Sequence, residues 1–215
     1  MSADDIRRTI SVTGVGRVAA AADILLLNLA VETQAAAASD ALTENNRQAA
    51  AVLSALKDHG TQERDIQTTQ LSIEPVTEQP RPNDTQPPKI VGYRVRNGLS
   101  ARLRDIQGAG AVIDAAVQAG GDATRIEGIS FSFADPSSLL VEARKRAIDD
   151  ARARARQLVD GLGVGLGGVI SISESDLGGG PRIQAFAAVA DSTPVLPGES
   201  EVAHQVTVGY EIFTK

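Results

Sequence analysis

The chain has no cysteine and no tryptophan among its 215 residues, and it has only two histidines. Without cysteine it forms no disulfide, no thiolate nucleophile, no zinc–thiolate site and no cysteine-ligated iron–sulfur cluster. Aromatic residues make up 3% of the chain. We therefore expect a core of Ala, Val, Leu and Ile, which offers few large rings for stacking a base or a sugar.

Basic residues are outnumbered, with 21 Lys and Arg against 27 Asp and Glu, which gives a net charge of −6. A protein that binds phosphate backbones needs a cationic surface, so the charge argues against nucleic acid as the main partner, with a local row of arginines as the one exception. The hydrophobic fraction of 42% is ordinary for a globular protein. The length suits one large domain, or a domain with an elaborated insertion, and we expect a single domain over residues 1–215 with a substantial core.

Long apolar runs are also missing. The most apolar segment, Ile24–Ala30, has the length of a strand and is interrupted by Asn28, so no transmembrane segment is expected. The first eight residues, Met1–Arg8, lack the apolar region of a signal peptide. The sequence as it stands therefore predicts a cytoplasmic protein. The alternative is a periplasmic or secreted protein whose signal peptide has been removed.

A recurring order of strand, alanine-rich helix and strand occupies Asp23–Ile73 and again Val91–Phe133. A long third helix is expected over Pro136–Leu162, and alternating residues over Val202–Ile212 predict a final strand. The predicted fold class is α+β. Two split strand–helix–strand units form a mostly antiparallel sheet packed by helices, with the third helix and the C-terminal strand added.

The helices are expected to face the core with apolar residues at helical spacing. On the third helix, Glu142 with Arg146 and Asp150 with Arg154 are spaced to form ion pairs. The expected core-facing residues are Leu42, Ala49, Leu53 and Leu56 in the first helix, Val112, Ile113, Ala116 and Val117 in the second, and Leu140, Ala143, Ala147, Ala151 and Leu158 in the third.

Proline and glycine mark the expected turns and loops. Residues 77–89 contain four prolines, and residues 176–200 are rich in Gly, Pro and small residues, so both are predicted to be long irregular loops. Gly14-Val15-Gly16 is interpreted as the turn that closes the first strand. Gly161–Gly168 follows a helix and precedes a strand, which indicates a helix end rather than a phosphate-binding loop.

The clearest predicted strand runs from Val91 to Arg104, and its apolar residues and arginines fall on opposite faces. Helices then cover the apolar face, and the arginine face meets water or another subunit. This face is a candidate subunit interface or binding site for an anionic ligand or an acidic protein surface. A face that only contacts solvent explains the pattern equally well. The residues concerned are Arg94, Arg96, Arg102 and Arg104.

No arrangement of residues predicts catalysis. His59 is expected in the last turn of the first helix, and His204 lies in mid-strand on an apolar face, each without a second histidine nearby. Acidic residues are scattered over helix surfaces, and there is no Gly-x-Ser-x-Gly motif. We therefore predict no catalytic residue, no metal, no cofactor and no enzymatic activity.

A series of segments, each weak alone, resembles in its order the SIMPL-domain family, named after a signalling molecule that associates with a pelle-like kinase. These segments cover most of Ile10–Ser173. They are Ile10–Gly16, Ala22–Ile24, Val31–Thr33, Asn45–Asn46, Asp65–Thr68, Gly92–Val95, Gly128–Phe131, Ala143–Ala147 and Ala151–Ala153.

The leading hypothesis is a non-enzymatic SIMPL-domain protein that assembles with copies of itself, with the long loops and the arginine face forming the contacts. Bacterial members of the family are typically exported, periplasmic or envelope-associated, are linked to stress tolerance, and are sometimes antigenic. Known relatives form large hollow homo-oligomers, and no catalytic residues define the family. The alternative hypothesis is a protein that binds a small ligand or an anion, or an enzyme of unrecognised type, through the arginine face.

Overall fold

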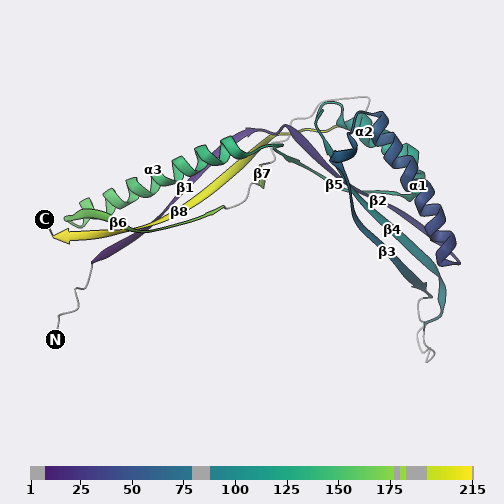
Figure 1. Ribbon diagram of the computed structural model, residues 1–215, viewed down its shortest axis with the longest axis horizontal. Coiled ribbons are helices and arrows are strands. Elements are labelled where there is room, and N and C mark those ends of the chain that lie inside the picture. Colours follow the sequence, from purple (N-terminus) through teal and green to yellow (C-terminus); the bar gives the residue numbers. More distant parts are fainter. Residues whose placement is uncertain (1–7, 79–87, 177–179, 183–192, 215) are drawn as a thin grey trace. The chain divides into compact units, whose positions relative to one another are not determined.

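Antiparallel strands and three helices make up the fold (Figure 1). The computed structural model describes residues 8–78, 88–176, 180–182 and 193–214. Within these residues the strands form two four-stranded sheets in which every pairing is antiparallel. The predicted α+β class is confirmed, and the strands are divided between two sheets where the sequence suggested one.

The described residues belong to two compact units that are interleaved along the chain. Unit 1 draws on Met1–Ala21, Phe133–Gln184 and Gly198–Lys215, and unit 2 on Ala22–Ser132 and Ala185–Pro197. Unit 1 therefore combines both ends of the chain, whereas unit 2 is mostly one continuous stretch. The prediction of a single domain over residues 1–215 stays a prediction.

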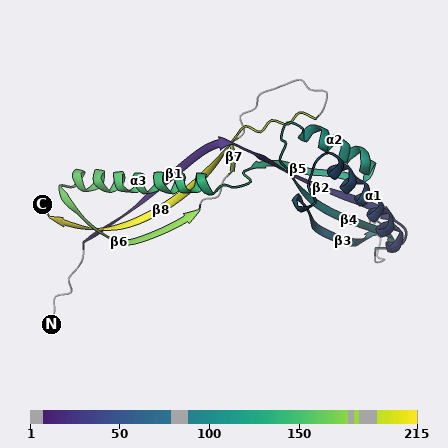
Figure 2. The same ribbon diagram turned by 45° about the horizontal axis from the view of Figure 1, so that its top comes forward.

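Unit 2 is a sheet with two helices on one face, as Figures 1 and 2 show. Its strand order is β3 (Ile66–Thr77), β4 (Ile90–Leu103), β2 (Ile24–Ala35) and β5 (Thr124–Ser132). The helices are α1 (Ala38–Asp58) and α2 (Ala109–Gly120), with short 3-10 turns at Glu63–Asp65 and Gly121–Ala123.

The core of unit 2 lies between this sheet and its helices. The alternate residues Leu25, Leu27 and Leu29 of β2 are fully buried there, because successive side chains of a strand point to opposite faces. The core-facing side of α1 differs from the prediction. Leu42 and Leu53 are only half-buried, and the buried residues are Ala41, Asn45, Ala49, Val52 and Leu56.

Unit 1 is a sheet packed by the longest helix, which runs along it in Figure 2. Its strands are β1 (Thr9–Ala21), β8 (Glu199–Thr214) and β6 (Val164–Asp176) in that order, with β7 (Gly180–Arg182) also paired to β8. The helix α3 (Ser137–Gly161) faces the sheet with Ala143, Ala147, Ala151, Ala155 and Val159.

Two glycines of β1 bring this helix unusually close to the strand. A Cβ atom at Gly14 would overlap the backbone of Ala147 and Ala151, and one at Gly16 would overlap the backbone of Ala143 and Ala147. The interpretation of Gly14-Val15-Gly16 as a turn is therefore wrong. The strand continues through these residues, and glycine is required there because the helix backbone occupies the space of a side chain.

The third helix confirms its expected ion pairs but corrects part of its expected core face. Arg146 pairs with Glu142 at 2.9 Å and Arg154 with Asp150 at 3.0 Å. Leu158 is exposed, and Val159 takes the core position, because the buried side of the helix follows the small residues that fit against β1.

The predicted loops agree with the structure only in part. The loop that connects β3 to β4 covers residues 78–89, of which residues 79–87 lie outside the described part of the chain. The second expected loop, residues 176–200, contains the strand β7, and its last two residues already belong to β8. Residues 177–179 and 183–192 lie outside the described part. The segment Gly161–Gly168 ends α3, as predicted, but the strand that was expected to follow it already begins within it, because β6 starts at Val164.

We predict that Gly14→Ala and Gly16→Ala each destabilise unit 1. The added methyl group forces α3 away from β1, and overpacking of this kind costs about 1–3 kcal/mol, or roughly 2–12 °C in Tm. Thermal unfolding followed by circular dichroism measures the effect. Gly168→Ala on β6 is the control, because nothing lies within 4 Å of a Cβ atom there. An equal Tm for all three variants would contradict this account of the glycines.

Candidate functional site: the arginine face of unit 2

The arginines of β4 lie as their alternation predicts, on the face of the sheet opposite the buried Val95, Leu99 and Leu103. The structure divides the four candidate residues into two groups. Arg94 and Arg96 lie in the first half of the strand, Arg102 lies near its end, and Arg104 directly follows its last residue, Leu103. The two groups have different neighbours, so we describe them separately.

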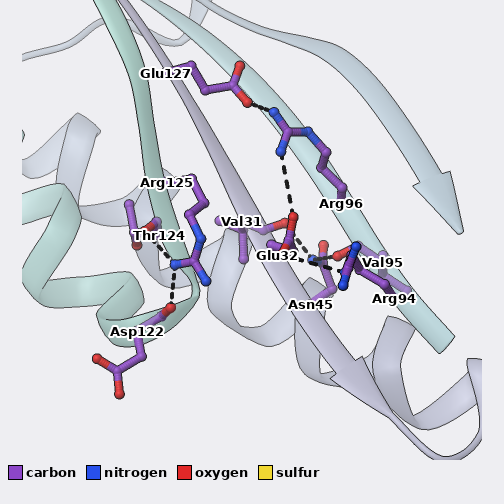
Figure 3. A network of polar contacts seen from close by, with 10 residues as sticks. All are labelled: Val31, Glu32, Asn45, Arg94, Val95, Arg96, Asp122, Thr124, Arg125 and Glu127. Atoms are coloured by element: carbon purple, nitrogen blue, oxygen red, sulfur yellow. Dashed lines mark hydrogen bonds and ion pairs between the residues drawn. The ribbon is translucent and has the colours of Figure 1, made fainter. Parts of the chain in front are cut away.

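Arg94 and Arg96 pair with acidic side chains of the same subunit (Figure 3). Glu32 of β2 contacts Arg94 at 3.7 Å and Arg96 at 3.6 Å. Arg96 also pairs with Glu127 of β5. Two cations therefore meet two carboxylates across three neighbouring strands. Ion pairs as exposed as these contribute little to stability, typically about 0–1 kcal/mol each.

Arg104 is held much more firmly by Asp65, which lies just before β3. Its Nε and Nη2 atoms donate to the two carboxylate oxygens at 3.0 and 2.9 Å, the two-pronged geometry that favours arginine over lysine. Asp65 is almost completely buried, and the hydrogen bonds from Arg104 lower the pKa of its carboxyl group below the ordinary value of 3.8. This pair joins the end of β4 to the start of β3.

Arg102 is exposed and forms no ion pair within the described residues. It lines a pocket of about 280 Å³ together with Arg104, Asp65, His59 and Thr61. His59 is at the end of α1, as predicted, and its Nδ1 lies 2.9 Å from the carbonyl oxygen of Ala55. The hydroxyl of Thr61 is buried and has no hydrogen-bond partner among the described atoms.

A buried amide below the arginine face was not identified by the sequence reasoning. Asn45 of α1 is fully buried, and its Nδ2 donates to the carbonyl oxygens of Val31 at 2.8 Å and Val95 at 3.3 Å (Figure 3). One side chain thus ties α1 to both β2 and β4, which fixes the rotation of the helix. The signal in the sequence was a polar residue within a row of small and apolar residues at four-residue spacing.

Unit 1 contains a cluster of three hydrogen-bonded side chains, His204, Glu174 and Arg144, that the sequence reasoning did not bring together. His204 is buried on the apolar face of β8, as predicted, and its Nε2 donates to Glu174 of β6 at 3.1 Å. Arg144 of α3 donates to the same carboxylate at 2.9 Å. Both hydrogen bonds lower the pKa of Glu174, and the one from His204 has the larger effect. The three residues link a helix and two strands, which is a structural role.

Other sites in the described residues have less polar character. A groove of about 590 Å³ between α2 and β5 is lined mainly by Ile113, Val117, Ile126 and Ile129. Within the described ranges, no group of three or more His, Cys, Asp or Glu residues is placed to hold a metal ion. None of the helices drawn in Figure 1 has the length and apolar character needed to cross a membrane.

The fold is thus that of an α+β protein with two helix-packed antiparallel sheets, and the arginine face of one sheet carries paired charges. The family model described as SIMPL, a protein of unknown function (DUF541), matches residues 10–210. The chain belongs to this SIMPL family, which confirms the resemblance found in the sequence.

Three relatives illustrate the similarity. The chain is 37% identical to the 26 kDa periplasmic immunogenic protein of Brucella melitensis over 216 residues, which cover 94% of this chain and 84% of the relative. The same values hold for the protein of that name from Brucella abortus. The uncharacterized protein YggE of Escherichia coli K12 is 28% identical over 193 residues, which cover 89% of this chain and 75% of the relative.

We predict that Asp65→Asn destabilises the protein at pH 7 and destabilises it less at pH 3. Arg104 lowers the pKa of Asp65 in the folded state, so the stabilisation is complete above the unfolded value of about 3.8 and is lost as the pH falls through the folded value. Urea unfolding at the two pH values measures the difference. Asp149→Asn, an exposed carboxylate on α3, is the control. An effect of Asp65→Asn that is equal at both pH values would contradict the role of the ionised pair.

Proposed function

We propose that this protein is a non-enzymatic member of the SIMPL family that assembles with copies of itself and serves a stress- or envelope-related role outside the cytoplasm. The observation that carries this proposal is the exposure of large apolar side chains along the strands at the edges of both sheets. Such surface marks sites of interaction with other macromolecules.

In unit 2 these side chains gather on the hairpin of β3 and β4. Leu71 and Ile73 of β3 and Ile90 and Val91 of β4 are all exposed by 45% or more. Ile73 pairs across the sheet with Val95, a core residue, so it points to the helix-covered side but lies beyond the cover of the helices. A second subunit that covered this hairpin would remove its apolar surface from water, at about 25 cal/mol per Å².

The arginine face is proposed as a second contact between copies. Arg94 and Arg96 lie 3.6–3.7 Å from Glu32, and their side chains remain 35–45% exposed, so an acidic surface of a neighbouring copy can still approach them. Complementary charges of this kind set the orientation and the rate of association more than its strength.

We propose that the protein is not an enzyme because the polar side chains described above connect parts of the fold. Asn45 and the Arg104–Asp65 pair connect elements within unit 2, and His204 with Glu174 connects elements within unit 1. Each of these groups is engaged in holding the fold together, as buried polar groups generally are.

A periplasmic location is proposed from the printed name of the Brucella relatives, which calls them periplasmic. This supports the alternative that the sequence left open rather than the cytoplasmic prediction.

We predict that multi-angle light scattering of the purified chain at micromolar concentration gives a mass that is a multiple of 22.4 kDa. Assembly buries the exposed apolar residues, so the mass should be insensitive to salt apart from a small effect on the charged contacts. Purified protein without a fusion tag is required. A mass of 22.4 kDa across the micromolar range would overturn the proposal of self-assembly.

A second candidate function is anion binding at the end of β4. The specific observation in its favour is the pocket in which Arg102, without a carboxylate partner among the described residues, lies beside Arg104 and His59. An oxyanion could accept hydrogen bonds from the guanidinium of Arg102 and from the Nη1 atom of Arg104, which the Asp65 pair leaves unused.

If this second candidate is right, inorganic phosphate raises the Tm of the protein by mass action, and Arg102→Gln abolishes the rise. Differential scanning fluorimetry at matched ionic strength, with chloride as the reference salt, makes the measurement. Arg152→Gln, an exposed arginine of α3, is the control and should behave like the unchanged protein. A rise that is equal in all three proteins, or absent from all, excludes a phosphate site at Arg102.

A further inference from the structure

The edges of a sheet expose unpaired backbone groups that attract other strands, and proteins usually protect them. In unit 1, α3 protects the edge at β1 directly. Asp150 accepts a hydrogen bond from the backbone nitrogen of Val15 at 2.9 Å, and Arg146 donates to the carbonyl oxygen of Arg17 at 2.7 Å. Two side chains of the helix thus occupy the backbone groups that an incoming strand would need.

In unit 2, both edges carry features that interrupt pairing. The register of β5 against β2 shifts between Asn28 and Leu29, and Gly128 there has a φ of +155°, a conformation that favours glycine. The register of β3 against β4 shifts between Thr68 and Gln70, and Pro75 of β3 has no backbone donor. Bulges and proline are common means of blocking an edge.

The remaining edge, β6, carries its bulges only in its first half, and within the described residues its second half is regular. Two bulges interrupt its first half, but from Ser171 to Asp176 it pairs with β8 in regular register. Its large side chains are turned to solvent, with exposed fractions of 52% for Val169, 45% for Ile170 and 68% for Ile172. Ile172 lies in the regular stretch, and Val169 and Ile170 lie directly before it. A regular strand end with exposed apolar side chains is a template for the addition of another strand.

The charges around β6 favour a second copy of the same strand as its partner. Residues 164–173 contain no charged side chain, so two identical strands can approach without electrostatic repulsion. The first charged residue, Glu174, is held by Arg144 and His204 of its own subunit. Gly168 has no neighbour within 4 Å of its Cβ position, which leaves room for a branched side chain from the opposite strand.

We propose that β6 pairs in antiparallel orientation with β6 of a second copy, which joins the sheets of two subunits into one. The contact buries Val169, Ile170 and Ile172 of both copies. Because the same strand is used by both partners, the pairing is two-fold symmetric and closes as a dimer. This inference rests on the proposed self-assembly and names one of its interfaces; the hairpin of β3 and β4 then joins such dimers to one another.

Single cysteines test the pairing directly, because the natural chain has none. In an antiparallel pair of identical strands, only residues close to the two-fold axis face the same residue of the other copy. A disulfide forms only where the two Cα atoms are within about 7 Å of each other. Four consecutive positions are replaced in turn, so that an axis at either an odd-numbered or an even-numbered residue is detected: Ile170→Cys, Ser171→Cys, Ile172→Cys and Ser173→Cys. Each variant is oxidised, and the disulfide-linked dimer is quantified on non-reducing gels. Ser11→Cys on the protected edge β1 is the control.

We expect one maximum of cross-linking among the four β6 positions, with the dimer as the main product, and only background at Ser11. Cross-linking that is equally weak at every β6 position overturns the pairing. Equal cross-linking at Ser11 and on β6 also overturns it, because collisions between subunits would then explain the product.

A charge substitution provides a second readout. Ile172→Lys places a cation on the exposed edge and should lower the mass in light scattering by about two-fold or more, because it separates the paired subunits. Leu158→Lys is the matched control: it is 47% exposed on the same unit but lies beside Ser11 and Thr13 of β1. Circular dichroism verifies that both variants are folded.

The results separate the two proposals. If the unchanged protein is oligomeric while Ile172→Lys keeps its mass and no β6 cysteine cross-links, the β6 interface is overturned and self-assembly stands. If the unchanged protein is a monomer and no β6 cysteine cross-links, both proposals are overturned. A loss of mass in Ile172→Lys but not in Leu158→Lys, together with the cross-linking maximum, supports the interface.

Discussion

The close approach of α3 to β1 is the constraint on which unit 1 depends. Gly14 and Gly16 have no side chains, and the helix faces them with alanines at four-residue spacing, so that two backbones lie in direct contact. This arrangement brings polar side chains of the helix to the backbone groups of β1, where Asp150 and Arg146 satisfy one donor and one acceptor. At one edge of the sheet, β1, side chains of α3 therefore bind backbone groups. The two edges of this sheet differ in this respect.

The other flank of α3 serves a different purpose. Arg144 donates a hydrogen bond to Glu174 of β6, which also accepts one from the buried His204 of β8. On this side the helix is therefore joined to the strands through their side chains, whereas at β1 it binds the backbone. In unit 2 a single amide, Asn45, has the comparable task of tying α1 to two strands. Both devices satisfy buried polar groups, which would otherwise be costly. The surfaces that we propose for interaction are places where the described residues show no such connection.

The sequence allowed the class, the three helices and the arginine alternation to be predicted, because each depends on short-range periodicity. The pairing of Arg96 with Glu127 and of Arg104 with Asp65 could not be predicted, since it depends on which strands become neighbours. The same holds for the division into two sheets. The two β1 glycines were taken for a turn because glycine fits both a turn and a close contact, and only the position of α3 distinguishes the two.

The arginine face illustrates why a pattern of charge alone is weak support for an interface. Glu32 sits opposite Arg96 in the register of β2 and β4, so the charge on this face is largely balanced within the subunit. Balanced and exposed pairs give little net attraction, whereas burial of apolar surface gives a free energy that grows with its area. In the assembly that we propose, apolar edges such as β6 would therefore supply the strength, and the arginines would supply the orientation. The two kinds of surface are complementary. An apolar strand edge sets the direction of pairing but allows the register of the strands to slip. Charged side chains at defined positions oppose such a shift in register.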